Sequence, residues 1–135
     1  MKKNNILKKS HFKFKRSLSF TKHILKFGTV GLKLKQTCFI TDSQENLLKF
    51  LLFKNLKRIS LTKVKVFFNS KCSYSATKLP LESRMGKGKG EICYSFGYYK
   101  KGFILFELTS FSLINAIKLQ TQLNKKKIVR LKIIF

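Results

Sequence analysis

Residues 84–90 read Arg-Met-Gly-Lys-Gly-Lys-Gly, and this stretch constrains the chain more than any other. Glycine has no Cβ, so at every second position it lets backbone N–H groups and lysine ammonium groups reach the same phosphates. The alternative interpretation is a solvated basic linker with no binding function, because most runs of charge are solvated. The candidates for contact with a polyanion are Arg84, Met85, Gly86, Lys87, Gly88, Lys89 and Gly90.

The glycine-lysine stretch closes a longer segment, residues 69–90, that shows no helical or strand periodicity. A loop of this length is uncommon in a compact domain unless it is functional or disordered. The position of the stretch therefore predicts a functional loop at 69–90.

The charge balance indicates an acidic partner. Thirty Lys and Arg face five Asp and Glu, which gives a net charge of +25 over 135 residues. Such self-repulsion opposes a compact state unless a polyanion neutralises it. Yet 44% of the residues are apolar, more than a disordered basic tail carries, so part of the chain folds. We expect one domain at 27–135, preceded by a basic arm at 1–26 that orders against its partner.

The apolar periodicity predicts alternating strands and helices. Strands are expected at 30–39 and 63–68, a hairpin of strands at 92–98 and 103–108, and a final strand at 127–135. One helix is expected from residue 41 or 42 to about residue 56, and a second after Ser110. This order predicts an α+β fold, a two-layer sandwich in which two helices cover one face of a mainly antiparallel sheet.

Each predicted helix has a starting signal and an apolar face. Thr41 with Gln44, or Asp42 with Glu45, has the spacing of a capping box, and Ser110 is the expected cap of the second helix. The expected apolar faces are Leu48, Leu51 and Leu52 widened by Phe50 and Phe53 in the first helix, and Leu113, Ala116, Ile117 and Leu123 in the second.

The sequence offers no constellation for catalysis. Its five carboxylates are scattered, and both histidines, His11 and His23, lie in the arm, far from Cys72 and Cys93. A nucleotide-hydrolase phosphate loop needs Gly-Lys-Ser/Thr before a helix, whereas Gly90 is followed by an acid and a strand. The histidine and cysteine spacing matches no metal site. We therefore expect neither an enzyme nor a cofactor.

Two other features bear on the environment of the chain. The three cysteines are irregularly spaced, which argues against a disulfide framework and favours small buried residues in a reducing compartment. No apolar run reaches 18 residues, so no membrane span is expected. A cationic membrane-surface binding protein remains the alternative, but basic residues spread over arm, loop and strands fit RNA better.

Four segments resemble one family. Residues 84–90 match at every position the signature of the universal ribosomal large-subunit protein known in bacterial naming as L-sixteen. Residues 27–33 resemble its Phe-Gly-x-x-Gly-Leu-Lys, 78–84 its Lys-Pro stretch, and 102–108 its Gly-x-x-Leu-x-Glu-Met segment. They occur in the order of the family, so the resemblance spans roughly residues 27–135.

The resemblance implies a structural constituent of the large subunit that binds its rRNA and helps position A-site tRNA near the peptidyl-transferase centre. On that analogy Arg84, Lys87 and Lys89 hold rRNA or tRNA phosphates, and Gly86, Gly88 and Gly90 permit close approach. The second RNA-facing element comprises Phe27, Gly28, Gly31 and Lys33. Neighbouring large-subunit proteins are expected as partners, and no homo-oligomer is.

Composition and register suggest a compartment. The frequent residue types Lys, Phe, Ile, Leu and Asn have A/T-rich codons, and residues 27–33 begin at nearly the same distance from the start as in bacterial relatives, without an import presequence. We expect an organelle-encoded protein of the mitochondrial ribosome. A plastid or the cytoplasm of an A/T-rich bacterium is the alternative.

Overall fold

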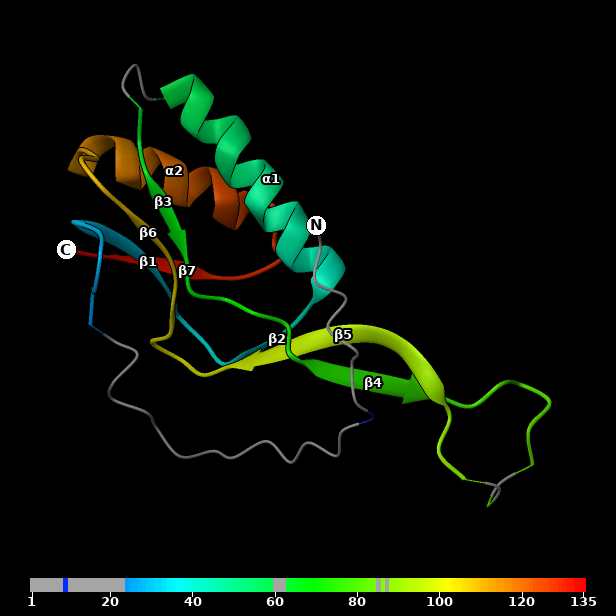
Figure 1. Cartoon of the computed structure of the whole chain (residues 1–135). Helices are drawn as coiled ribbons and strands as arrows, with labels where there is room; N and C mark the ends of the chain where they lie inside the picture. The colour runs from blue at the N-terminus through cyan, green and yellow to red at the C-terminus, as the bar shows by residue number, and fades with distance from the viewer. Residues whose placement is uncertain (1–8, 10–23, 60–62, 85, 87) are drawn as a thin grey trace.

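The computed structural model describes residues 9, 24–59, 63–84, 86 and 88–135. Most of the expected basic arm, together with Met85 and Lys87, lies outside the described residues. Figure 1 shows the elements in order. They are β1 (Val30–Leu34), β2 (Cys38–Thr41), α1 (Asp42–Ile59), β3 (Val66–Phe68), β4 (Tyr74–Lys78), β5 (Glu91–Tyr99), β6 (Ile104–Leu108), α2 (Leu113–Lys125) and β7 (Leu131–Ile134).

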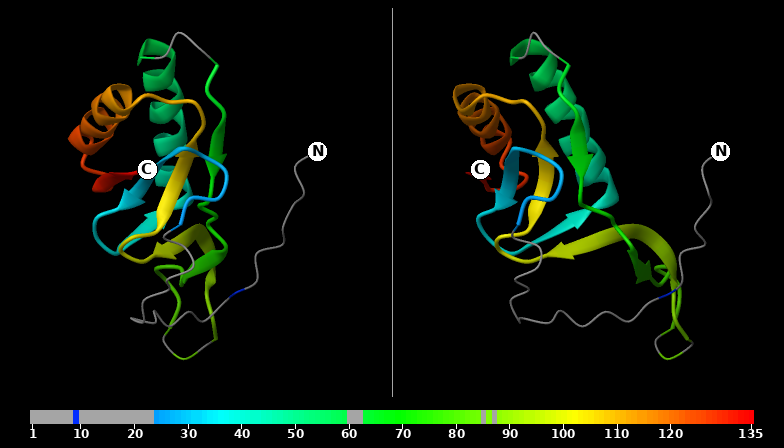
Figure 2. Two further views of the ribbon diagram at one scale, coloured as in Figure 1. Left: turned by 90° about the vertical axis from the view of Figure 1, so that its left-hand side faces the viewer. Right: turned by 60° about the vertical axis from the view of Figure 1, so that its left-hand side comes forward.

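The strands form two antiparallel sheets rather than one. Four strands pair in the order β3-β6-β1-β7, and three pair in the order β2-β5-β4. The α+β architecture is confirmed, with the two helices packed together on one side of the four-stranded sheet (Figure 2). The core between these layers is built from apolar side chains of α1, α2, β1, β6 and β7.

The single strand expected at 30–39 is two strands, one in each sheet. Leu34 ends β1 by donating from its backbone N–H to the carbonyl of Phe103, and its own carbonyl accepts from Gly102. Residues 35–37 are exposed and change the direction of the chain before β2. Alternation continues across this break, so the pattern alone could not reveal it.

The expected hairpin is wrong, although its turn is present. β5 pairs with β2 and β4, whereas β6 pairs with β1 and β3. Gly102 has a positive φ of 85° and the N–H of Phe103 donates to the carbonyl of Lys100, which makes a tight turn. Because Gly102 is also bonded to Leu34, this turn sends the chain from one sheet to the other.

The expected loop at 69–90 contains a strand. β4 has the sequence YSATK, in which only Ser75 is fully buried, so it lacks the apolar alternation that predicts a strand. It pairs with β5 from Tyr74 opposite Phe96 to Lys78 opposite Glu91. Together β4 and β5 form a ribbon that projects from the body of the molecule and ends in residues 79–90 (Figure 1).

The start of α1 settles the choice of capping box. The N–H of Thr41 donates to Gln44 Oε1 at 3.1 Å, and the N–H of Gln44 donates to Thr41 Oγ1 at 3.4 Å. Glu45 is instead buried. The second helix is capped by Ser112, which accepts from the N–H of Asn115, and not by the expected Ser110.

The buried faces of both helices differ in part from those expected. The buried apolar residues are Leu48, Leu52 and Leu56 in α1, and Ala116, Leu119 and Leu123 in α2. Among the expected residues, Phe50, Phe53, Leu113 and Ile117 are exposed. The apolar pattern therefore identified each helix but placed its buried stripe too broadly.

Candidate nucleic-acid interface

The glycine-lysine stretch lies at the far end of the β4–β5 ribbon. Arg84 and Lys89 are exposed there, as is the acid Glu82. The N–H of Ser83 donates to the carbonyl of Pro80 at 3.1 Å, which forms a turn on the outgoing side. The ribbon thus presents basic side chains well away from the core (Figure 1).

Two glycines of the stretch share an unusual backbone conformation. Gly86 has a φ of 89° and Gly88 a φ of 95°, a region that residues with a Cβ rarely adopt. No atom lies within 4 Å of the position that a Cβ would take at either glycine. Glycine is required here for the path of the backbone, and the surrounding space is open to a ligand.

Gly90 has a different role. A Cβ at this position would overlap the carbonyl oxygen of Lys78, on the neighbouring strand of the ribbon. Gly90 therefore lets the returning chain meet β4 just before Lys78 pairs with Glu91. It fixes the base of residues 79–90, whereas Gly86 and Gly88 shape their tip.

The second expected element, residues 27–33, begins with a segment bound to β6. Glu107 Oε2 accepts hydrogen bonds from three consecutive backbone N–H groups, those of Lys26 at 3.0 Å, Phe27 at 2.8 Å and Gly28 at 3.0 Å. Its Oε1 accepts from Asn69 Nδ2 at 2.8 Å. The Phe27 ring is 62% exposed and lies 5.2 Å from the ring of Phe67.

Burial would raise the pKa of Glu107, but the hydrogen bonds outweigh it. The side chain is 0% exposed, which disfavours the charged form. The donors at Phe27, Asn69, Gly28 and Lys26 favour the carboxylate and hold its pKa below the ordinary range. An ionised Glu107 therefore fixes the backbone from which Phe27 projects.

The other residues of this element are divided between the interior and the surface. A Cβ on Gly28 would lie 2.8 Å from Glu107 Cβ, and one on Gly31 would lie 3.0 Å from the Ile134 side chain. Both glycines serve packing against neighbouring strands, and Gly31 is buried. Lys33 is half-buried in β1, so Phe27 is the exposed one of the four residues expected to face RNA in this element.

The two expected elements do not form one site. Residues 24–29 lead into β1 of the four-stranded sheet, whereas the described residues among 79–90 lie at the end of the ribbon on the opposite side of the molecule (Figure 1). A partner that contacts both must be extended over the surface, as folded RNA is.

A buried ionic cluster connects α1 to the segment before β4, and sequence reasoning missed it. Cys72 Sγ donates to Glu45 Oε2 at 2.9 Å, and Lys49 Nζ lies 2.6 Å from Glu45 Oε1. Burial would raise the pKa of Glu45, but the bonds from Cys72 and Lys49 and the charge of Lys49 lower it overall. The signal available was the (i, i+4) pair of Glu45 and Lys49.

The role of Glu107 was also missed. A single acid inside the apolar strand Ile-Leu-Phe-Glu-Leu must be buried, and a buried carboxylate requires donors. The sequence therefore indicated that Glu107 needs donors, but it did not indicate which groups donate. One of them, the backbone N–H of Phe27, lies 80 residues earlier in the chain.

Cys38 and Cys72 are poorly suited to act as nucleophiles. Burial and the adjacent Glu45 carboxylate raise the pKa of Cys72 to about 12, and burial raises that of Cys38 to about 11. Cys38 and Cys72 are half-buried, whereas Cys93 is exposed, contrary to the expectation that all three are buried. A thiol with a raised pKa is protonated at neutral pH and is a poor nucleophile.

The described residues offer neither a cluster for a metal ion nor a helix that spans a membrane. These residues contain no group of three His, Cys, Asp or Glu side chains that could hold a metal ion. No helix within the described ranges is long and apolar enough to cross a membrane.

The chain is similar to known ribosomal proteins. Residues 1–134 match the model of the family described as ribosomal protein L16p/L10e. The large ribosomal subunit protein uL16m of Chondrus crispus is 36% identical over 128 residues, which cover 93% of each chain. The uL16 protein of Christiangramia forsetii is 36% identical over 93 residues, or 69% of this chain and 64% of that protein. The uL16 protein of Thermosipho africanus is 34% identical over 85 residues, or 63% of this chain and 57% of that protein.

The family consists of structural constituents of the large ribosomal subunit and is not a class of enzymes. With almost its full length matched by the family model and by a relative at 36% identity, this chain belongs to the ribosomal protein L16p/L10e family.

Proposed function

We propose that this protein binds large-subunit rRNA and helps position A-site tRNA near the peptidyl-transferase centre. The observation that carries the proposal is the placement of residues 84–90 at the end of a projecting ribbon, with open space around Gly86 and Gly88. A loop so placed can enter a narrow space between RNA strands while the domain stays on the surface of the particle.

The mechanism is electrostatic and steric. Arg84 offers a planar guanidinium that binds a phosphate through two parallel hydrogen bonds, whereas Lys87 and Lys89 supply charge without a fixed geometry. Glycines without side chains in open surroundings let a phosphate approach the backbone N–H groups closely. No proton transfer or covalent step is required of the protein.

The segment around Phe27 is the proposed second contact with rRNA. Its backbone is held by Glu107, and the exposed Phe27 ring can stack on a base while Lys26 and Lys33 lie nearby in sequence. Gly28 and Gly31 support this segment by close packing and are not expected to touch RNA directly.

We propose the mitochondrial ribosome as the site of action. The uL16m protein of Chondrus crispus covers 93% of this chain, whereas the bacterial relatives compared above cover 69% or less. The A/T-biased composition agrees with an organellar gene. A bacterial cytoplasm is the alternative, because the bacterial relatives have similar identity over the parts they match.

The function can be tested with Lys87→Ala/Lys89→Ala, compared with Lys125→Ala/Lys126→Ala at the exposed end of α2 as a charge-matched control. Both variants should sediment with large subunits, but only the loop variant should lose A-site tRNA binding. Equal tRNA binding by the two variants would reject the tRNA part of the proposal.

The rRNA part has its own readout. The wild-type chain should leave large subunits on treatment with high salt or RNase, because its phosphate contacts release counterions and weaken steeply with salt. Sedimentation with lipid vesicles that persists after RNase would instead favour the membrane-surface alternative.

A further inference from the structure

A pocket of about 430 Å³ opens where the chain twice crosses from one sheet to the other. One wall comes from residues 69–74, the connection from β3 to β4 with the first residue of β4, and the other from residues 97–103, the end of β5 with the turn that leads to β6. Residues 69–74 fall within the functional loop predicted at 69–90, but none of the lining residues is among the individual residues predicted to contact RNA. The volume of the pocket lies in the range typical of small-ligand sites.

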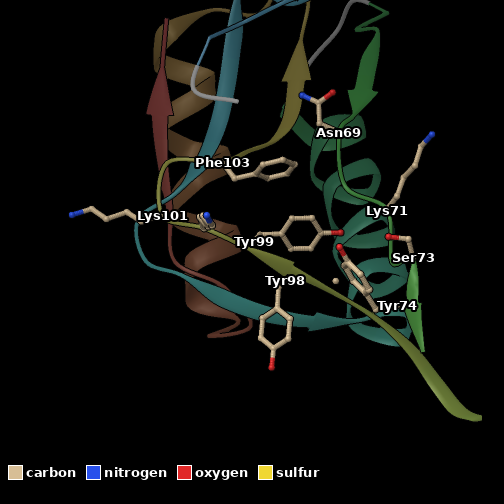
Figure 3. Close-up of a pocket in the computed structure, with 10 residues that line it drawn as sticks. Asn69, Lys71, Ser73, Tyr74, Tyr98, Tyr99, Lys101 and Phe103 are labelled. Carbon is tan, nitrogen blue, oxygen red and sulfur yellow. The ribbon is translucent and has the colours of Figure 1, made fainter. Parts of the chain in front are cut away.

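The floor of the pocket is aromatic. The rings of Tyr99 and Phe103 lie 4.9 Å apart with an interplanar angle of 35°, and Figure 3 shows one above the other. Tyr74 approaches from the opposite wall. Gly97 leaves the space that Tyr99 occupies, because a Cβ there would lie 2.5 Å from the Tyr99 hydroxyl. Flat apolar walls of this kind suit a nucleobase.

The rim of the pocket is basic. Lys71 and Lys101 are exposed and come from opposite walls, and Lys100 also contributes to the lining. The described lining residues include no acid. Such a rim attracts a phosphate group, so the charge points to an anionic ligand.

A buried polar atom also faces this region. Tyr99 is 6% exposed, and its hydroxyl makes no hydrogen bond of ordinary geometry among the described residues, although the Lys71 backbone and the Cys72 thiol lie near enough to affect its pKa. A buried hydroxyl without a partner costs free energy, which a polar ligand atom can recover. Ser73 adds a second hydroxyl from the opposite wall.

The pocket is continuous with the proposed rRNA contact. Asn69 and Phe103 line both this pocket and a smaller one of about 190 Å³, whose other walls include Lys26 and Glu107. Asn69 also donates to Glu107, which holds the Phe27 segment. A strand of RNA that contacts Phe27 therefore lies close enough to place a neighbouring nucleotide here.

From these features we propose that the pocket receives one unpaired nucleotide of large-subunit rRNA. The base lies against the aromatic floor within reach of the Tyr99 hydroxyl, and its flanking phosphates lie at Lys71 and Lys101. Double-stranded RNA keeps its bases stacked, so only a loop, bulge or end can supply this ligand. The inference rests on the proposed rRNA binding and adds a site to it.

The test uses full-length protein assembled into large subunits. Ser73→Trp fills the mouth of the pocket, and Lys71→Ala/Lys101→Ala removes the charge at its rim. The matched controls are Thr121→Trp and Lys125→Ala/Lys126→Ala, at exposed positions of α2 and its end. Chemical probing of the rRNA bases compares all five particles, wild type included.

One unpaired base, protected in the wild-type particle, should become about fivefold or more reactive in both pocket variants, the change expected from losing one stacking contact. Its reactivity should not change in the controls. An unchanged pattern in the pocket variants, or the same change in the controls, overturns the pocket assignment. Failure of the wild-type chain to enter large subunits at all would instead reject the proposed function.

A second measurement covers pocket variants that fail to assemble. The photoreactive residue p-benzoylphenylalanine in place of Lys101, at the rim of the pocket and not in its mouth, should crosslink to a single unpaired rRNA nucleotide in the particle. Crosslinking to another protein, or to another part of this chain, overturns the proposal. Competition by free nucleoside monophosphate, tested in the same reaction, would assign the pocket to a soluble ligand and overturn it as well.

Discussion

Glu107 Oε2 accepts a 2.8 Å hydrogen bond from the backbone N–H of Phe27, which lies 80 residues earlier in the chain. The same oxygen accepts from the N–H groups of Lys26 and Gly28, so one carboxylate fixes three successive peptide units. Hydrogen bonds to an ionised acceptor are stronger than those between neutral groups. The exposed ring of Phe27 is therefore presented from a rigid backbone.

Glu107→Gln should loosen this segment. The variant keeps the size of the side chain but removes its charge, and we expect a loss of about 2 kcal/mol in the free energy of unfolding, since hydrogen bonds to charged groups contribute about 1.5–3 kcal/mol. Denaturant unfolding in about 1 M salt, where the self-repulsion of the chain is screened, measures this loss.

The matched control is Glu91→Gln, at an exposed position of β5. It should leave the free energy of unfolding nearly unchanged. Hydrogen exchange adds a local readout, because the amides of Lys26, Phe27 and Gly28 should exchange faster in Glu107→Gln only. Equal protection of these amides in both variants would show that the charge of Glu107 does not hold the segment.

Stability should decrease in acid. Hydrogen bonding lowers the pKa of Glu107 below its ordinary value of 4.5, and the pKa of Glu45 is lowered as well. The folded state therefore favours the ionised carboxylates, and their contribution is fully present above pH 4.5. It is lost as the pH falls through the lower folded-state pKa values.

Denaturant midpoints measured from about pH 6 to about pH 3 should record this loss. The slope should be smaller in Glu107→Gln, which has one fewer group to protonate. An identical slope in the wild type and the variant would mean that Glu107 does not contribute to the pH dependence.

Local sequence patterns predicted the helices and strands that bury one face. They failed where the course of the backbone depends on hydrogen bonds to segments distant in sequence. The alternation of β5 and β7 and the periodicity of both helices were sufficient to predict them. β4 was not predicted as a strand, because its sequence Tyr-Ser-Ala-Thr-Lys has almost no apolar alternation. Two strands joined by a glycine turn fit a hairpin as well as a crossing between sheets. The two are separated by strand pairing, because β5 pairs with β2 and β4 whereas β6 pairs with β1 and β3.

The same limit applies to the candidate site. The glycine-lysine stretch was recognisable from its spacing, and Gly86 and Gly88 have the open surroundings expected of an approach to phosphate. The tight neighbours of Gly28, Gly31 and Gly90 belong to other strands, so their packing roles could not be predicted from local sequence. The pocket between the sheets depends entirely on the crossings that the hairpin prediction excluded.

The free protein should lack a cooperative thermal transition at low salt. Its net charge of +25 acts on one small core, and this repulsion is unscreened without RNA. Adding an rRNA fragment or a simple polyphosphate should restore a cooperative transition, followed by circular dichroism. A sharp transition of the protein alone in low salt would contradict this account of its folding.

Gly90→Ala and Gly88→Ala should have separable effects. The Cβ of Gly90→Ala overlaps the Lys78 carbonyl, so the amides at the start of β5 should lose protection against hydrogen exchange. Gly88→Ala is strained by its φ of 95°, a cost of about 1–2 kcal/mol, but its side chain meets no atom. The ribbon should therefore remain paired in Gly88→Ala. Loss of protection in both variants would argue that Gly90 has no special role in closing the ribbon.

Arg84→Lys tests whether the geometry of the guanidinium matters or only its charge. Arg84 is exposed at the start of the glycine-lysine stretch, and arginine is scarce in this lysine-rich chain. A bidentate contact with phosphate cannot be reproduced by an ammonium group, so the variant should bind A-site tRNA about tenfold more weakly or assemble into subunits less well. Arg58→Lys, exposed at the end of α1, is the matched control and should behave as the wild type. If both substitutions are silent, charge alone accounts for the loop, and Lys87 and Lys89 would carry the interaction.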